Sequence, residues 1–366
     1  MIDLTGYKEL NNVFGGSEKK TSVRYNGIEH MLKYPDPIRE KKNDLSYMNN
    51  QYSEHIGCMI YDYLGIPVQE TFLATFIPKD DNKMRIVVAC KNFLQGNEVL
   101  IEFGKLGLQN YISDRQITTT IEDVYKVINK VSDIDQNLIK ERFWDMFVVD
   151  AFIINKDRHL DNWGFIADKD NDYVLSRIAP VYDCGSSLAA TVSDKNMMEA
   201  LSDENKFKNL EYNVASVYSI NGNKIFYNKI FQEPFYDLKQ AVCRIVPKIN
   251  MEDIKKIVNS VEGMSEIRKK YLCKALEYRY DNILQPALEK VLKEEKIKEL
   301  SSTEGVVSFI KKGLENGRRL DDIRKDLMKH CPIKSYVERK SIVGAAVKQV
   351  AKCSKFKKYF NDGIEL

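Results

Sequence analysis

The feature that most constrains this chain is a polar run that directly follows a hydrophobic segment. Residues 143–154 read Phe-Trp-Asp-Met-Phe-Val-Val-Asp-Ala-Phe-Ile-Ile, a pattern that predicts a buried helix. Residues 155–162 follow as Asn-Lys-Asp-Arg-His-Leu-Asp-Asn, without a Gly or Pro. A polar run held at the end of a buried helix is typical of a functional site built on a rigid scaffold.

Three side chains in this region have the spacing of a phosphoryl-transfer site. Asp157 and Asn162 lie five positions apart, and Asp183 follows about twenty residues later in Val-Tyr-Asp-Cys-Gly. In such sites one carboxylate accepts the proton of the attacking hydroxyl. An amide oxygen and a second carboxylate hold the metal that bridges the ATP phosphates.

Features nearer the N-terminus supply the remaining parts of such a site. Residues 14–20 contain a Gly-Gly turn whose backbone amides can approach phosphate oxygens. Lys33 ends a strand and can reach phosphates, and Glu54 lies on the next helix, from which it can pair with Lys33. Each feature alone is weak, but their order along the chain is that of a protein-kinase-like fold.

The wider pattern predicts an α+β, two-lobed fold of this kind. A small β-rich N-lobe with one helix is expected over residues 1–95, with strands at 21–25 and 29–34 around the turn Asn26-Gly27 and a helix at 49–64. A large, mostly helical C-lobe is expected over residues 96–295, helical almost throughout after Ser187. Residues 296–366 are expected to form a C-terminal helical module.

The chain resembles the HipA-like serine/threonine kinases over roughly residues 12–290. The resemblance is carried by the loop 155–162 and by Ala-Pro-Val-Tyr-Asp at 179–183. Looser matches are the turn 15–19, Met-Leu-Lys-Tyr-Pro at 31–35 and the helical segment 50–68. In that family an extra N-terminal subdomain commonly precedes the phosphate loop, so we expect a short form here.

The resemblance implies a role for each candidate residue. Asp157 would be the catalytic base, assisted by Lys33 on the phosphates and by Glu54, which positions Lys33. Asn162 and Asp183 would bind Mg²⁺. We expect His159 to lie at the nucleotide site and, with Arg158, to brace the loop. The other residues expected to contact ATP are Gly15, Gly16, Ser17 and Lys19 over the phosphates and, in the adenine linker 88–94, Cys90 and Phe93.

The resemblance also implies regulation and partners. Kinases of this family can phosphorylate a serine of their own phosphate loop, which makes Ser17 the candidate and Ser22 a second choice. We expect a protein substrate with a Ser or Thr acceptor, and an antitoxin or other regulatory partner, as for a bacterial toxin or growth regulator. Alternatives that the residues leave open are a phosphatidylinositol-type lipid kinase, which shares the Asp-Arg-His-x-x-Asn pattern, a nucleotide-binding pseudokinase or adaptor, and a nucleotidyl transferase.

Composition narrows the remaining classes of protein. Seven cysteines without a Cys-x-x-Cys pair argue against structural zinc or a disulfide framework and favour the cytoplasm. No signal peptide or membrane span is expected, which leaves export as an effector open. Residues 291–366 carry 18 Lys and Arg against 11 Asp and Glu, a net of +7, but their mixed signs favour a solvated helical surface over nucleic-acid binding.

Overall fold

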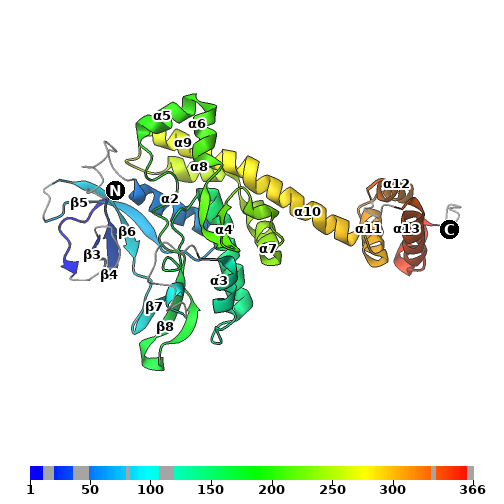
Figure 1. The fold of residues 1–366 in the computed structure, drawn as a ribbon, viewed down its shortest axis with the longest axis horizontal. Helices are drawn as coiled ribbons and strands as arrows, with labels where there is room; N and C mark the ends of the chain where they lie inside the picture. The colour runs from blue at the N-terminus through cyan, green and yellow to red at the C-terminus, as the bar shows by residue number, and fades with distance from the viewer. Residues whose placement is uncertain (11–19, 36–48, 80–82, 107–118, 331–334, 361–366) are drawn as a thin grey trace. The chain divides into compact units, whose positions relative to one another are not determined.

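The chain forms two compact units, Met1–Ala287 and Leu288–Leu366. The computed structural model describes residues 1–10, 20–35, 49–79, 83–106, 119–330 and 335–360. The first unit contains a β-rich lobe followed by a mostly helical lobe (Figure 1), which confirms the expected α+β architecture. The boundaries at residues 95 and 295 remain predictions.

The β-rich lobe is a six-stranded sheet that curls around its own core. Its order is β1-β5-β6-β4-β3-β2, so β1 (Ile2–Asp3) and β2 (Glu9–Leu10) lie on opposite edges. Five strand spacings would separate these edges by about 24 Å in a flat sheet, whereas the chain from Asp3 to Glu9 reaches about 20 Å at most. The sheet therefore curls, and it encloses a core that includes Leu4, Val23, Leu32, Tyr34, Ala74, Phe76, Val87 and Ala89.

The hairpin that carries Lys33 forms as its turn residues predict. Strands β3 (Lys20–Tyr25) and β4 (Ile28–Lys33) pair antiparallel on either side of Asn26 and Gly27. Both turn residues have positive φ, +50° and +78°, as a tight hairpin of this kind requires. The register places Lys20 opposite Lys33 at the open end of the hairpin. The sheet is completed by β5 (Thr71–Phe76) and β6 (Arg85–Lys91).

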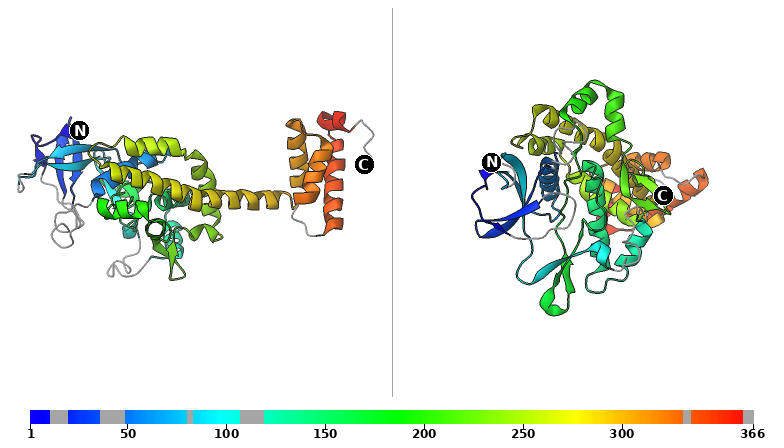
Figure 2. Two further views of the ribbon diagram at one scale, coloured as in Figure 1. Left: turned by 90° about the horizontal axis from the view of Figure 1, so that it is seen from above. Right: turned by 60° about the vertical axis from the view of Figure 1, so that its left-hand side comes forward.

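Helix α2 (Asn50–Tyr63) packs against β5 and β6 on one side and against the helical lobe on the other (Figure 2). Gly65 follows the helix with φ +78°, the left-handed conformation in which glycine often ends a helix. A Cβ at Gly57 would lie 2.6 Å from the Cys184 Cβ, so glycine allows α2 to lie directly against the Asp183 loop.

The helical lobe contains more β-structure than predicted. Strand β7 (Glu98–Glu102) pairs with β8 (Gly164–Asp168), which pairs with β9 (Val174–Ile178). The expectation of nearly continuous helix after Ser187 was wrong, because β10 (Ala215–Ile220) and β11 (Asn223–Phe226) form a hairpin.

The helices of this lobe include α4 (Gln136–Ile153), which precedes the polar run and packs against α3 (Ile121–Ile128), α7 (Tyr236–Ile245) and α9 (Glu266–Arg279). The lobe also contains α5 (Asp194–Ser202), α6 (Glu204–Glu211) and α8 (Met251–Asn259). Helix α9 continues through a π-helical turn (Tyr280–Leu284) into α10 (Gln285–Glu299). Short 3-10 helices lie at Phe103–Lys105, Lys169–Asn171, Ile230–Gln232, Val246–Lys248 and, in the second unit, Ser354–Tyr359.

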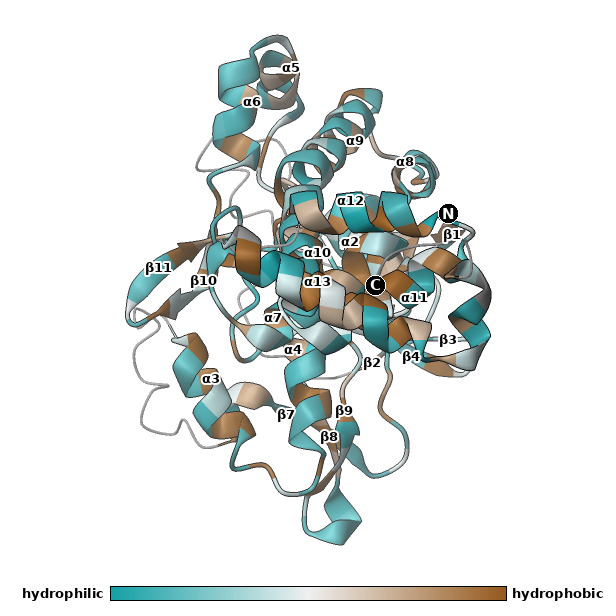
Figure 3. Ribbon diagram, turned by 90° about the vertical axis from the view of Figure 1, so that its right-hand side faces the viewer, coloured by the Kyte–Doolittle hydropathy of each residue, from teal (hydrophilic) through white to brown (hydrophobic). Residues whose placement is uncertain are grey.

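The second unit has its own hydrophobic core. Its helices are α11 (Thr303–Glu315), α12 (Leu320–His330) and α13 (Tyr336–Ala351). Most residues of α12 are hydrophilic (teal in Figure 3), while its Leu320, Ile323 and Leu327 are buried. None of the helices within the described residues is long and apolar enough to cross a membrane.

Candidate active site

The polar run begins where α4 ends, at a strained residue. Asp135 caps the start of α4 by accepting a hydrogen bond from the Asn137 amide, and Ile154 ends the helix with φ +51°. A β-branched residue rarely adopts this left-handed conformation, which turns the chain sharply out of the helix. Ile153 and Ile154 are buried, so the apolar end of α4 anchors the loop that follows. The buried helix and its polar loop are therefore confirmed.

Within the loop, Asp157 faces solvent and Asn162 is buried. The Asp157 side chain is 53% exposed, and its amide donates to Asn155 Oδ1 at 3.1 Å. The Asn162 amide nitrogen donates to the Asp157 carbonyl at 2.7 Å. This hydrogen bond fixes the distance between the two residues, and it leaves the Asn162 amide oxygen as the atom suited to a metal.

Lys33, Glu54 and Asp183 form a charge cluster that we call the cleft triad. Lys33 Nζ lies 3.0 Å from Glu54 Oε2 and 2.8 Å from Asp183 Oδ1. Lys33 and Glu54 are buried, whereas the Asp183 side chain is 30% exposed. The predicted pairing of the strand lysine with the helix glutamate is thus present, and the lysine also meets the acidic residue 150 positions further along the chain.

The electrostatic environment keeps Asp183 ionised. Burial acts to raise the pKa of this carboxyl, but the Lys33 ammonium, its hydrogen bond and the Lys20 charge lower the pKa to about 2. Lys20 was not among the predicted site residues. Its position opposite Lys33 in the hairpin register is the signal that places it at this cluster.

The Asp183 segment is held by backbone contacts with both lobes. Val181 exchanges two backbone hydrogen bonds with Pro67 and Gln69, each of 2.8 Å. Asp183 has φ +58°, and Asn155 Nδ2 donates to its carbonyl at 3.4 Å. These contacts aim the Asp183 side chain toward Lys33.

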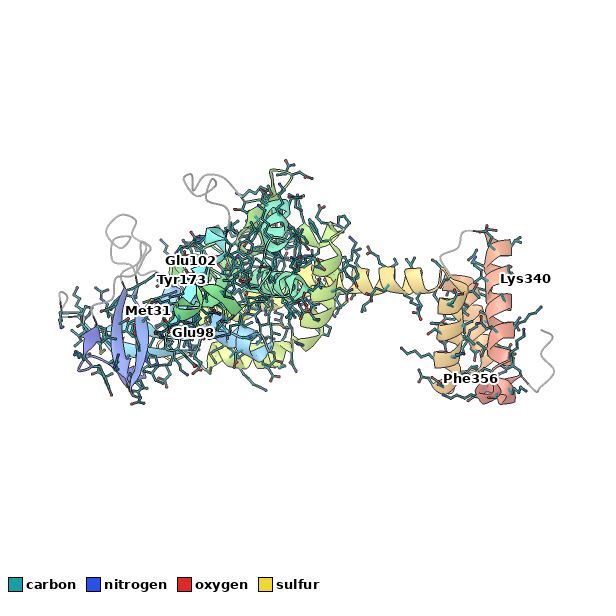
Figure 4. The ribbon with its side chains drawn as sticks, turned by 90° about the horizontal axis from the view of Figure 1, so that it is seen from below. Met31, Glu98, Glu102, Tyr173, Lys340 and Phe356 are labelled. Atoms are coloured by element: carbon teal, nitrogen blue, oxygen red, sulfur yellow. The ribbon has the colours of Figure 1, made fainter. Side chains whose placement is uncertain are left out.

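The linker expected to meet adenine lies next to this cluster. Cys90 is fully buried on β6, opposite Met31, and Val88 is opposite Lys33. Because side chains alternate along a strand, Met31 and Lys33 lie on the same face of β4; Figure 4 shows Met31 within this sheet. Phe93 stacks on Tyr182, with ring centroids 6.0 Å apart.

Met31 and Tyr182 lie beside the predicted site residues, and motif reasoning assigned no role to either. Met31 could have been found from its place two residues before Lys33, on the same face of the strand. Tyr182 precedes Asp183, and its hydroxyl donates to the Asp161 carbonyl at 3.1 Å. Together with Phe93, Tyr182 adds an aromatic surface to the region predicted for adenine.

His159 lies beside Asp157 but is solvent-exposed. Its Nε2 is 3.8 Å from Asp157 Oδ1, and its Nδ1 accepts a hydrogen bond from the Asp161 amide at 3.2 Å. The ring therefore caps the loop locally.

The remaining predicted residues can be placed only in part. The phosphate-loop residues Gly15, Gly16, Ser17 and Lys19 lie outside the described residues. Ser22, the second candidate for self-phosphorylation, is fully buried on β3, where its hydroxyl donates to Glu29 at 3.2 Å.

Comparison with known proteins identifies the family of this chain. The model of the HipA-like C-terminal domain family matches residues 13–264. The serine/threonine-protein kinase CtkA of Helicobacter pylori is 35% identical over 296 residues, 78% of this chain and 87% of that protein. A crystal structure of H. pylori CtkA, described as a proinflammatory kinase, has a TM-score of 0.72 and 32% identity, and covers 80% of this chain and 98% of that one.

A more distant likeness is to HipA of Shewanella oneidensis, solved with HipB and operator DNA. It has 14% identity and a TM-score of 0.43 over 77% of this chain and 70% of that one, so it adds nothing to the inference. The family match and the CtkA likeness each span most of the first unit. The chain belongs to the HipA-like C-terminal domain family and is a kinase.

Proposed function

We propose that this kinase transfers the γ-phosphoryl group of ATP, with Mg²⁺, to a Ser or Thr hydroxyl of a protein. The observation that carries the proposal is the cleft triad beside the Asp157–Asn162 loop. Residues far apart in sequence supply a phosphate-binding cation, its positioning carboxylate, two oxygen ligands and an exposed base. The serine/threonine kinase CtkA, at 35% identity, supports the acceptor class.

The residues present suit magnesium. Mg²⁺ prefers oxygen ligands and is usually bound by one or two carboxylates together with substrate phosphates. The Asp183 carboxylate, with its pKa held at about 2, and the Asn162 amide oxygen are such ligands. Within the described ranges no group of three or more His, Cys, Asp or Glu side chains forms a cage that would hold a metal without substrate. When bound, the ion would neutralise charge on the phosphates.

The protein's own residues have separate tasks in this reaction. Lys33 binds the α- and β-phosphates, and Glu54 holds the lysine in place. Asp157 orients the acceptor hydroxyl and accepts its proton, since its half-exposed carboxylate is reachable by a macromolecular substrate. Phe93 and Tyr182 border the adenine.

Self-phosphorylation, partners and location are part of the same proposal. Family resemblance supports phosphorylation of Ser17, a protein substrate, an antitoxin-like regulatory partner and a role as toxin or growth regulator in the cytoplasm. Intact-mass measurement after incubation with Mg·ATP tests the first of these. A single added phosphate on the wild type, absent from Ser17→Ala, is expected. No added phosphate on the wild type would contradict it.

The catalytic assignment is tested by Asp157→Asn. We expect phosphate transfer to a protein acceptor to fall by about 10²- to 10⁴-fold, because the base is lost, while Mg·ATP binding is retained. Asp161→Asn, an equally exposed carboxylate in the same loop, is the control and should change the rate by less than about threefold. Wild-type-like transfer by Asp157→Asn, or transfer to phosphoinositide vesicles but not to protein, would contradict the proposal.

A further inference from the structure

A second buried charge cluster lies beneath the catalytic loop, and it reaches back to α2. Its members are Tyr61 on α2, Asp150 on α4 and Arg158 in the loop, and we call it the loop brace. Arg158 Nε lies 2.9 Å from Asp150 Oδ2, with both side chains only 1% exposed. The Tyr61 hydroxyl lies 2.8 Å from Asp150 Oδ1 and 3.0 Å from the Met146 carbonyl.

Arg158 uses its other donors to hold the two catalytic segments together. Its Nη1 donates to the Asn162 carbonyl at 2.8 Å and also to the Tyr182 carbonyl. Its Nη2 lies 3.4 Å from Cys184 Sγ. One guanidinium therefore contacts the residue that ends the catalytic loop and both neighbours of Asp183. The orientation of that guanidinium is fixed by Asp150.

Tyr61 connects the loop brace to α2, the helix that also carries Glu54 of the cleft triad. Glu54 and Tyr61 are seven residues apart on α2, which is close to two helical turns and places them on similar sides of the helix, about 10 Å apart along its axis. Glu54 contacts Lys33, and Tyr61 contacts Asp150. A shift or rotation of α2 would therefore strain the lysine pair and the loop brace together.

We propose that Tyr61 and Asp150 are positioning residues that make the placement of Asp157, Asn162 and Asp183 depend on the placement of α2. The proposal rests on the catalytic roles given above. In this proposal helix α2, which fixes the position of Lys33 through Glu54, also fixes the position of the catalytic loop. It does so through the Tyr61 hydroxyl, the Asp150 carboxylate and the Arg158 guanidinium, none of which would contact nucleotide or acceptor.

The chemistry of the chain suits a positioning role. A hydrogen bond to an ionised acceptor is stronger and more directional than one between neutral groups. A buried pair of one carboxylate and one guanidinium, with the remaining donors directed at two carbonyls and a sulfur, has few alternative arrangements. The Tyr61 ring itself is fully buried, so removal of its hydroxyl leaves the apolar packing of α2 unchanged.

The test is Tyr61→Phe, with two matched controls. Tyr63→Phe removes a hydroxyl from the same helix, where it lies 3.4 Å from Asp253 at the surface. Tyr125→Phe removes a hydroxyl that donates to the Asp237 carboxylate at 2.6 Å and accepts from Trp144 Nε1 on α4, without a hydrogen bond to Asp150 or Arg158 among the described residues. We expect Tyr61→Phe to lower kcat by about tenfold with KM for ATP within about twofold, because small misplacements of catalytic groups affect turnover more than binding. Both controls should keep kcat within about twofold of wild type.

A double variant tests whether Tyr61 and Glu54 act through one helix. If they do, the kcat loss of Tyr61→Phe/Glu54→Gln should be at least about threefold smaller than the product of the single losses. Multiplicative losses, or a Tyr61→Phe kcat equal to that of the two controls, would overturn the inference. Asp157→Asn is measured in the same series. If that variant is inactive while Tyr61→Phe is normal, the positioning role fails and the proposed function stands; an active Asp157→Asn removes the basis of both.

Discussion

The cleft triad and the loop brace are both buried charge clusters, but their charges are matched differently. The triad places one cation between two carboxylates, and Glu54 Oε1 has no hydrogen-bond partner within the described residues. The brace pairs one carboxylate with one guanidinium, whose other donors meet two backbone carbonyls and the Cys184 sulfur. The triad itself has one cation for two carboxylates and lies next to solvent, which suits a site that binds a metal ion and phosphates. The brace has one positive and one negative charge, both buried, which suits a permanent support.

The largest effect that this comparison predicts is on stability, from Arg158→Met. Removing the guanidinium leaves the Asp150 carboxylate buried without its counter-charge. We expect the free energy of unfolding, measured by urea denaturation, to fall by about 3–5 kcal/mol. Arg244→Met is the matched control, since Arg244 pairs with Asp145 on the same helix α4 but is one-third exposed.

The control should lose only about 1 kcal/mol, because water screens a partly exposed pair. Equal losses of unfolding free energy in the two variants would show that the buried Arg158–Asp150 pair stabilises the protein no more than a partly exposed pair. A double variant, Asp150→Leu/Arg158→Met, should recover part of the lost stability, because no buried charge remains unpaired, and yet stay poorly active.

The triad could be predicted from the sequence more fully than the brace, and the reason is physical. The triad and Asp157–Asn162 follow from residue order, because phosphoryl transfer requires these residue types and the chain can supply them in few ways. Arg158 was expected to brace the loop, but its partners depend on which helices pack together, and that information is not local. Asp150 did carry a signal, since a carboxylate inside an apolar run must find a buried partner. Nothing in the sequence indicated that Tyr61 would be part of it.

The missed hairpin shows a different kind of failure. Asn221-Gly222, between β10 and β11, is the same turn dipeptide as Asn26-Gly27, and both of its residues have positive φ, +48° and +76°. The strands around it are short and lie within a long helical region, so the helical periodicity of the neighbours dominated the prediction. Here the turn chemistry was the better guide.

The second expected effect is on activity, from Lys33→Met. The loss of the phosphate-binding cation should lower kcat/KM for ATP by at least about 10²-fold. The accompanying loss of stability should be smaller than for Arg158→Met, because Asp183 is partly exposed and water can screen its charge. Steady-state kinetics and urea denaturation on the same preparations check both parts. A loss of stability as large as that of Arg158→Met would erase the distinction between the clusters.

The third effect is the pH dependence of the triad. In the native protein the pKa of Asp183 is about 2, below its ordinary 3.8, so the stabilisation it provides is present above about pH 4 and is lost as pH falls toward 2. In Lys33→Met the dominant lowering influence is gone and burial raises this pKa. The difference in unfolding free energy between wild type and variant should therefore shrink by about 1–2 kcal/mol between pH 6 and pH 3.

A surface lysine provides the control for this pH effect. Lys91→Met removes the partner of exposed Glu70, and its difference from wild type should vary little over the same range. If the Lys33→Met difference were constant from pH 6 to pH 3, or grew as pH fell, Lys33 would not be what holds the Asp183 pKa down.

The smallest effect is expected at His159, whose ring lies beside the predicted base Asp157. His159→Gln should lower kcat by less than about threefold, because the ring is 44% exposed and its Nε2 stands 3.8 Å from Asp157 Oδ1, beyond hydrogen-bonding distance. Glutamine keeps a polar group that can still cap the loop at the Asp161 amide. The kcat of the variant is measured between pH 5.5 and pH 8, beside Asp157→Asn. A loss as large as that of Asp157→Asn would make the histidine the base and assign the catalytic proton to the imidazole instead of the carboxylate.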